Sequence, residues 1–342
     1  MDQRKTLSGT TAFEVPEVYE LAMVVISLTA AGPDLTADSD YAKAVAQHFA
    51  PYADHELISR LGINSSKTDW FSAYEFRENA AAFCFDSENE DLIVRCKPYS
   101  HVWGRQANVF VRNIDLVADF ARVSGFRAFY VEHKSLYEAE IRAWKDRVDV
   151  GAMKVWLEAR FPVSEDHYGI VFSPLTNGWH STQGYEDGDF AIRVMYLESV
   201  SDQPISDAYN AARIVFTEID HSHVNAVAEQ YRARLNSANA FGGDFWFKSE
   251  NGVYDDGFRV FTEYMTWAVF ELWARETYPE AMQTEITSSV APKMTLQRRF
   301  IHYADFRDAL IKRYQIQTGV VDIAALYPDI IAWAEDFRAM NE

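Results

Sequence analysis

A cluster of polar residues interrupts an apolar stretch in the middle of the chain. The segment Ala211–Asn225 is mostly apolar, which predicts a helix buried on most of its circumference. At about 100° per residue, Thr217 and His221 lie on one face of this helix, with Glu218 beside them. This is the spacing of a His-Glu-x-x-His zinc helix, in which two imidazoles bind the metal and the glutamate activates its water. Thr217 stands where the first histidine is needed, and a neutral hydroxyl is a poor zinc ligand.

The same stretch resembles the central motif of DUF4932, a family of bacterial domains of unknown function. That motif is similar to His-Glu-Phe-x-His-Ser-Phe-Val-Asn-Pro. Here Thr217 replaces its first histidine, His223 its aromatic residue and Ala226 its proline. Further segments resemble the family, so that the resemblance extends from about Phe13 to Glu276. These segments are Val15–Leu21, Phe172–Gly178 and Phe261–Met265.

The family is similar to gluzincin metallopeptidases, and the resemblance implies their fold and chemistry. It implies that His221 and Glu263, which lies on a later helix, are zinc ligands. It also implies that Glu218 is the catalytic general base, which accepts a proton from the attacking water and later protonates the leaving nitrogen of a peptide or amide. The function expected on this basis is that of a zinc-dependent metallopeptidase-like protein with a degenerate metal motif.

The missing ligand leaves two hypotheses for His221 and Glu263. In the first, they keep a metal site in which another residue substitutes for the lost histidine. His180, in a loop beside the expected strands, is one candidate, and His223 is the other. His223 lies about 200° round the helix from His221, so it qualifies only if the helix ends or unwinds there. In the second hypothesis, His221 and Glu263 form a buried pair without metal. Asp220 and His223, at i and i+3, could pair on the opposite face of the helix in a local contact.

These two hypotheses correspond to two classes of function. A retained metal favours the peptidase. A metal-free pair favours a catalytically inactive pseudo-peptidase that binds peptides or proteins, and Thr217 is the main support for that alternative. Stoichiometric metal would favour the first function, and an ion pair between His221 and a carboxylate would favour the second. If the aligned geometry is intact, Thr217→His is expected to raise zinc affinity by at least about tenfold.

Composition argues against several other functions. The formal net charge of −19 provides no basic stripe for phosphate groups, so nucleic-acid binding is not expected. No apolar run reaches the length of about 18 residues that would predict a membrane span. The first residues lack the apolar core of a secretory signal, which favours a cytoplasmic protein unless a leader has been removed. Cys84 and Cys96 allow one disulfide, although a buried free thiol is favoured at Cys84. The oligomeric state is left open.

The expected fold is α+β and predominantly α-helical, in a single domain over residues 13–342. A helical N-terminal layer is expected at about 13–160, a site-bearing part at about 165–280 and C-terminal helices at about 294–340. Strands at Tyr168–Ser173 and Phe190–Tyr196 form a small sheet before the metal helix, and an edge strand there would hold an extended peptide. Strands are not expected elsewhere. The helices predicted from periodicity and end signals are 17–28, 38 or 39 to 49, 54–61, 67–85, several within 114–159, 256–276, 296–314 and 323–340.

Overall fold

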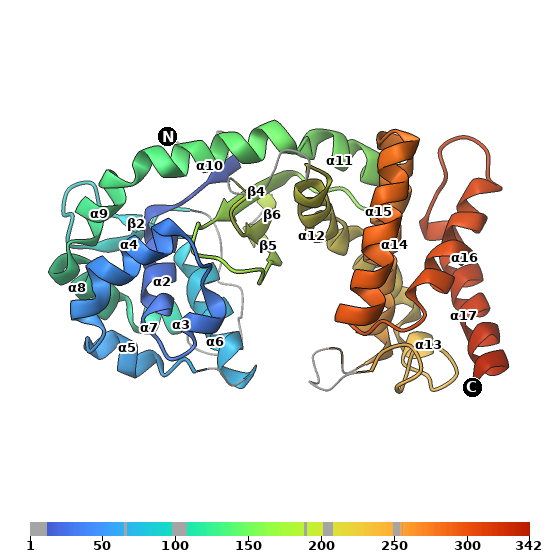
Figure 1. Ribbon diagram of the computed structural model, residues 1–342, viewed down its shortest axis with the longest axis horizontal. Coiled ribbons are helices and arrows are strands. Elements are labelled where there is room, and N and C mark those ends of the chain that lie inside the picture. The colour runs from blue at the N-terminus through green and yellow to red at the C-terminus, as the bar shows by residue number, and fades with distance from the viewer. Residues whose placement is uncertain are drawn as a thin grey trace. The chain divides into compact units, whose positions relative to one another are not determined.

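The computed structural model describes residues 12–64, 67–97, 108–187, 190–200, 208–248, 254 and 256–342. Helices dominate these residues, and short strands form a small sheet and a hairpin, which confirms the predicted α+β, mostly helical class (Figure 1). None of the helices in these residues is both long and apolar enough to cross a membrane. The chain divides into two compact units, one comprising Met1–Asp149 and Glu165–Ile214, the other Val150–Ser164 and Val215–Glu342. The expectation of a single domain stays a prediction.

The sheet of the first unit has the strand order β1-β4-β6-β5. β4 (His167–Phe172) and β6 (Phe190–Leu197) are the two strands predicted from the sequence, and they run parallel. β5 (Ser181–Asp187) occupies the connection between them and pairs with β6 in antiparallel fashion. β1 (Ala12–Glu14) adds a parallel strand beside β4. The prediction that strands occur only in the middle of the chain is therefore wrong. β1 is three residues long and depends on a distant partner, so local patterning does not mark it.

The helices of the first unit confirm most of the predicted end signals. The Ser39 hydroxyl accepts a hydrogen bond of 3.1 Å from the Ala42 amide and so caps the helix that follows. Gly62 ends a later helix in the left-handed conformation at φ 59°, where glycine carries no steric penalty. The helices are α2 (Glu17–Ser27), α3 (Gly32–Leu35), α4 (Asp40–Phe49), α5 (Glu56–Leu61), α6 (Lys67–Ala80), α7 (Val109–Arg112), α8 (Ile114–Ser124), α9 (Phe126–Glu132) and α10 (Lys134–Arg147).

The predicted helix at 67–85 is too long. α6 ends at Ala80, and the next residues form β2 (Phe83–Phe85), which pairs with β3 (Ile93–Arg95) in an antiparallel hairpin. Within β2 the two phenylalanines are buried and Cys84 between them is half-buried, which is the two-residue alternation of a strand. The apolar run that precedes Cys84 fits a buried helix and a buried strand equally well, so periodicity alone placed the boundary incorrectly.

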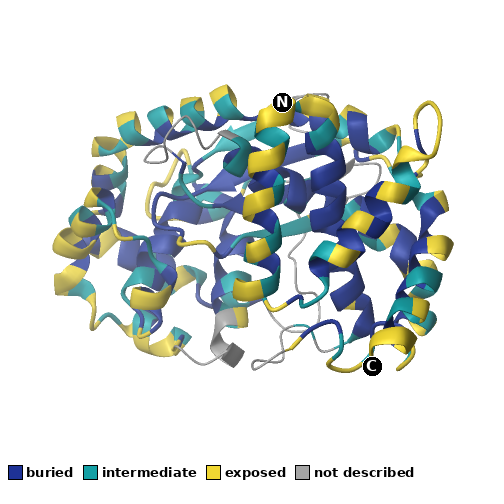
Figure 2. Ribbon diagram, turned by 45° about the vertical axis from the view of Figure 1, so that its right-hand side comes forward, coloured by how far each residue is buried: buried dark blue, intermediate teal, exposed yellow. Residues whose placement is uncertain are grey.

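The second unit contains mostly helices. α14 is buried on all sides from Phe261 to Ala274, and the Asp256 carboxylate caps its start by accepting 2.7 Å from the Arg259 amide (Figure 2). The expected helix at 296–314 begins later, at Tyr303, because a π-helical turn (Lys293–Gln297) precedes it. The helices are α11 (Val150–Glu158), α12 (Ala208–Ala228, divided between the units after Ile214), α13 (Arg232–Leu235), α14 (Gly257–Thr277), α15 (Glu280–Pro292), α16 (Tyr303–Gln315) and α17 (Tyr327–Asn341).

Candidate functional site

The helix that carries the degenerate motif is continuous through all its polar residues. α12 extends three turns beyond Thr217 without a break. Thr217 is buried, whereas Glu218 and His221 are half-buried. Helical spacing therefore places Thr217, Glu218 and His221 on adjoining parts of one surface, as predicted. The regular helix also keeps His223 on a different side from Thr217, which leaves no local route for it to replace the missing ligand.

Glu263 on α14 is a buried carboxylate that is held by two donors. Its side chain is only 8% exposed. The guanidinium of Arg298 lies 2.6 Å from Oε1, and the indole Nε1 of Trp267 donates to the same oxygen at 2.9 Å. Burial raises the pKa of Glu263, but Arg298 and then His221 outweigh it and leave the pKa below its ordinary value of 4.5. The structure thus brings His221 and Glu263 into electrostatic contact, and it adds a cation that was not predicted.

Arg298 is placed by an irregular segment of backbone. The π-helical turn Lys293–Gln297 leads directly into it, and Arg299 follows with φ 66°, the only positive φ of a non-glycine residue in the described parts of the chain. Phe300 then forms an isolated β-bridge with Phe247. Irregularities of this kind cost free energy and are concentrated at functional sites. No sequence motif marks Arg298, because the helix pattern continues through this segment without interruption.

Arg298 also contacts two aromatic residues near Glu263. Its Nη2 donates 2.6 Å to the Tyr254 hydroxyl, and its guanidinium carbon lies 5.0 Å from the centre of the Trp267 ring. Trp267 therefore stacks on the cation and donates to the anion of the same pair. A pair held from so many directions is rigid, because each contact restricts a different rotation of the two side chains.

Asp220 does not form the pair with His223 that the sequence suggests. Asp220 is fully buried, and neither of its carboxyl oxygens forms a well-formed hydrogen bond with any described residue. Burial, followed by the nearby carboxylate of Glu263, raises its pKa well above 3.8, which favours the neutral form. His223 instead lies with Nδ1 at 3.2 Å from the Ser222 hydroxyl. The prediction failed because α14 covers this side of α12: the Thr266 hydroxyl faces Asp220 and lies 3.4 Å from His221 Nδ1.

His180 belongs to the first unit. Its Nε2 lies 3.6 Å from Oε2 of Glu198, and burial lowers the pKa of the imidazole, which favours its neutral form. Burial raises the pKa of Glu198, but contact with His180 outweighs this effect and the net shift is downward. His180 therefore has a local partner, and its proposed role as a substitute zinc ligand stays a prediction.

The sequence also predicted that an edge strand of the sheet would hold an extended peptide, and β5 is such a strand. In the strand order it is the last strand on its side of the sheet, paired along one edge with β6. Ser181, Thr182 and Gln183 are half-buried, and Gly184 is exposed. A side chain at Gly184 would meet the guanidinium of Arg193 at 2.8 Å, so a larger residue there would require the Arg193 side chain to move. No other strand of the described residues pairs with the outer edge of β5, and an added extended peptide would need such an edge.

The side chains at the α12–α14 site do not fit zinc as they stand. Among the described residues no group of three or more His, Cys, Asp or Glu side chains is arranged to hold a metal ion. Thr217 supplies a neutral hydroxyl, and the Glu263 carboxylate is already neutralised by Arg298. A dication placed between His221 and Glu263 would also be repelled by that guanidinium. Zinc binding remains a prediction from the sequence resemblance.

Comparison with known proteins adds no further information: no family model, curated protein or solved structure matches the chain.

Proposed function

We propose that this chain is a gluzincin-like protein of the DUF4932 type that has become a pseudo-peptidase, and that it binds extended peptide segments without a resident zinc ion. The observation that carries the proposal is the Glu263–Arg298 ion pair at 2.6 Å. Glu263 is the residue that the resemblance assigns as the last zinc ligand. Thr217 replaces the first expected zinc ligand, and Arg298 pairs with the carboxylate of the last one. Two of the three expected metal contacts are therefore altered.

The ion pair supports a metal-free site on electrostatic grounds. A buried carboxylate requires a compensating positive charge, which in a metallopeptidase is the metal. Here Arg298 supplies that charge, and Trp267 donates to the same carboxylate oxygen. For zinc to bind Glu263, it would have to displace the Arg298 guanidinium from the buried carboxylate. That exchange breaks a charge-assisted hydrogen bond and places two cations close together, so zinc affinity is expected to be weak.

The edge strand β5 supports peptide binding. An extended peptide can pair with the outer edge of β5, and its alternate side chains then face opposite sides of the sheet. Backbone pairing of this kind is largely independent of sequence, which suits a module that holds peptides without cleaving them. The partner class is therefore an extended peptide or an unfolded segment of a protein.

A zinc-dependent peptidase is the second candidate function. One observation favours it: His221 and Glu263 come into electrostatic contact across α12 and α14, as the resemblance implies for two zinc ligands. Glu218, which is half-buried beside His221, would then be the general base.

Metal analysis separates the two candidates. We expect elemental analysis of the purified wild-type protein, before and after dialysis with zinc, to find no stoichiometric metal. The double variant Thr217→His/Arg298→Met restores the imidazole and removes the competing cation. Its zinc affinity should exceed that of either single variant by at least about tenfold. About one zinc per wild-type chain, lost in both His221→Ala and Glu263→Ala, would overturn the proposal in favour of the peptidase.

Hydrogen exchange tests the peptide-binding part. The probe is an equimolar mixture of ten-residue peptides of random sequence, added in excess to the wild-type protein. We expect slower amide exchange in Ser181–Asp187, and unchanged exchange in β2 and β3, which form a separate hairpin. Absence of protection in β5, with no bound peptide in equilibrium dialysis, would contradict this surface as the binding site.

A further inference from the structure

The two cysteines of the chain lie side by side on one hairpin of the first unit. Cys84 is the middle residue of β2 and pairs with Val94 of β3, while Cys96 directly follows β3. The Cys96 amide donates 3.0 Å to the carbonyl oxygen of Ala82, which continues the antiparallel register. Cys96 is thus two residues beyond the partner of Cys84, so the two side chains share a face of the hairpin. The Cys84 thiol is close enough to Cys96 to raise the pKa of the Cys96 thiol.

Both thiols are free, and both cysteines are half-buried, so small reagents can reach them. Diagonal neighbours in an antiparallel pair have Cα atoms about 7–8 Å apart, slightly beyond the range of about 4.4–6.8 Å that a disulfide prefers. Because both side chains extend from the same face of the hairpin, their sulfurs can meet without a change of register. A bond therefore requires the two strands to approach by about 1 Å.

We propose that Cys84 and Cys96 are a reversible modification site, which a small disulfide such as glutathione disulfide converts from a dithiol to an intramolecular disulfide. Cys84, as a thiolate, attacks one sulfur of glutathione disulfide and releases one glutathione thiolate. Cys96 then loses its proton to solvent and attacks Sγ of Cys84, which releases the second glutathione. The protein loses two electrons and two protons, and the reagent is reduced to two thiols.

The environment of Cys96 sets the order of these steps. Burial, and then the neighbouring Cys84 thiol, raise the pKa of Cys96 to about 12. Cys96 is therefore a poor first nucleophile near neutral pH, because only the thiolate attacks. Once Cys84 carries glutathione, its thiol no longer contributes to that shift. The high local concentration of Cys96 beside the mixed disulfide then favours the second step.

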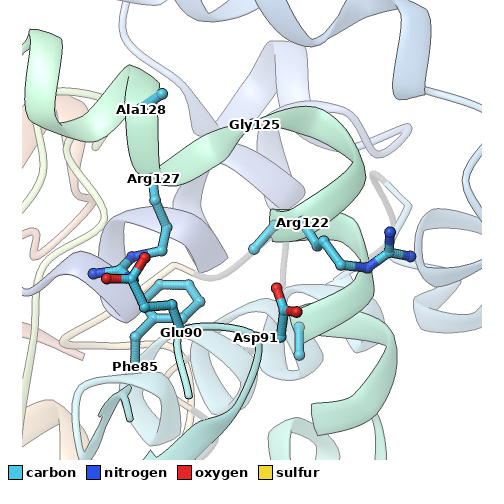
Figure 3. A pocket seen from close by; sticks show the side chains of 9 residues that line it. Phe85, Glu90, Asp91, Arg122, Gly125, Arg127 and Ala128 are labelled. Carbon is cyan, nitrogen blue, oxygen red and sulfur yellow. The ribbon is translucent and has the colours of Figure 1, made fainter. Parts of the chain in front are cut away.

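The disulfide would close the hairpin that forms one wall of a cavity of about 170 Å³ (Figure 3). The hairpin contributes Phe85, Glu90 and Asp91, and α8, α9 and their junction line the rest. Glu90 is tied to Arg127 of α9 at 2.9 Å, and the Arg127 guanidinium lies 4.8 Å from the centre of the Phe85 ring. Two strands of three residues each are marginal alone. A covalent link at their base therefore fixes this wall of the cavity.

The test is incubation of the reduced full-length protein with excess glutathione disulfide at pH 8, followed by intact mass and peptide mapping. We expect the wild-type chain to lose two hydrogen atoms and to yield a Cys84–Cys96 linked peptide. Cys96→Ser should stop at a mixed disulfide with glutathione on Cys84. Cys84→Ser should react more slowly, by about tenfold, because its remaining thiol is the poorer nucleophile.

Several outcomes would overturn the proposal. They are a wild-type product that retains glutathione, a wild-type chain that stays reduced, or a disulfide between two chains. As a second measurement, amide exchange in Ile93–Arg95 should slow by about tenfold on oxidation and recover when dithiothreitol is added. Unchanged exchange in an oxidised chain would show that the bond forms without fixing the hairpin.

Discussion

Glu20 of the first unit and Glu263 of the second are both buried carboxyls on buried helices, and they are accommodated in opposite ways. Glu20 on α2 is fully buried and accepts 2.7 Å from the Tyr41 hydroxyl. Burial raises its pKa to about 7, and the hydroxyls of Ser173 and Tyr41 only partly oppose that shift. Glu263 is also buried, yet its pKa lies below the ordinary value because Arg298 neutralises it. Burial favours the protonated form of Glu20, whereas Arg298 keeps Glu263 ionised.

The difference shows where this chain retains a buried charge. Asp220, two residues beyond Glu218 on α12, resembles Glu20: it is fully buried and favoured in the neutral form. Glu263 alone among the three receives a cation, and that cation comes from an irregular segment that is distant in sequence. Glu20 shows that hydrogen bonds from neutral hydroxyls can accommodate a buried carboxyl. The ion pair at Glu263 instead keeps that carboxylate charged in the folded chain.

The largest effect is expected from Arg298→Met, which removes the cation and leaves the carboxylate buried. We expect the free energy of unfolding at pH 7 to fall by about 3–5 kcal/mol in urea titrations. The folded-state pKa of Glu263 is depressed, so the pair stabilises the protein above about pH 4.5 and this contribution is lost as pH falls through the depressed value. Arg60→Met breaks an exposed pair with Glu56 and should cost less than about 1 kcal/mol. Equal costs for the two variants would contradict the comparison.

Glu20→Gln should change how stability depends on pH. Glu20 has a folded pKa of about 7 against an ordinary value of 4.5, so its contribution is fully present below pH 4.5 and is lost as pH rises through 7. That loss amounts to about 3 kcal/mol in the wild-type protein. Glutamine does not titrate, so the variant should lack this component. The measurement is the free energy of unfolding between pH 4.5 and 8.5. Parallel curves for the two proteins would show that Glu20 is charged throughout.

The smallest effect is expected from Asp220→Asn. Because Asp220 is favoured in the neutral form, an amide of the same shape should change the free energy of unfolding at pH 6 by no more than about 1 kcal/mol. Its raised pKa also means that wild-type stability is lost as pH rises through that value, and the variant should not share this loss. A cost as large as that of Arg298→Met would mean that Asp220 is charged and bound to a cation.

Local sequence signals predicted most helices but not the elements that depend on distant partners. Ser39 and Gly62 marked helix ends correctly, because the first acts through its own hydrogen bond and the second through its own φ. β1 and the β2–β3 hairpin were missed, because such short strands are stable only when a partner pairs with them.

The candidate site was predicted only in part for the same reason. Helical spacing placed Glu218 and His221 correctly on α12, and the resemblance to the metallopeptidases pointed to Glu263. Nothing in the sequence indicated Arg298, since its position depends on a π-helical turn and on the positive φ of Arg299. The same applies to Asp220, whose neighbour Thr266 belongs to another helix.

The order of segments along the chain also limits how early each unit can fold during synthesis. β1 is synthesised more than 150 residues before its partner residues Gly169–Val171. α11 belongs to the second unit but is made before β4, β5 and β6 of the first. Its Trp156 packs against Phe216, so the apolar face of α11 stays without that partner while the sheet is still being synthesised. The first unit has all its segments once Ile214 has been made, whereas the second unit must wait for Val215–Glu342, and the apolar face of α11 is open to chaperones during that interval.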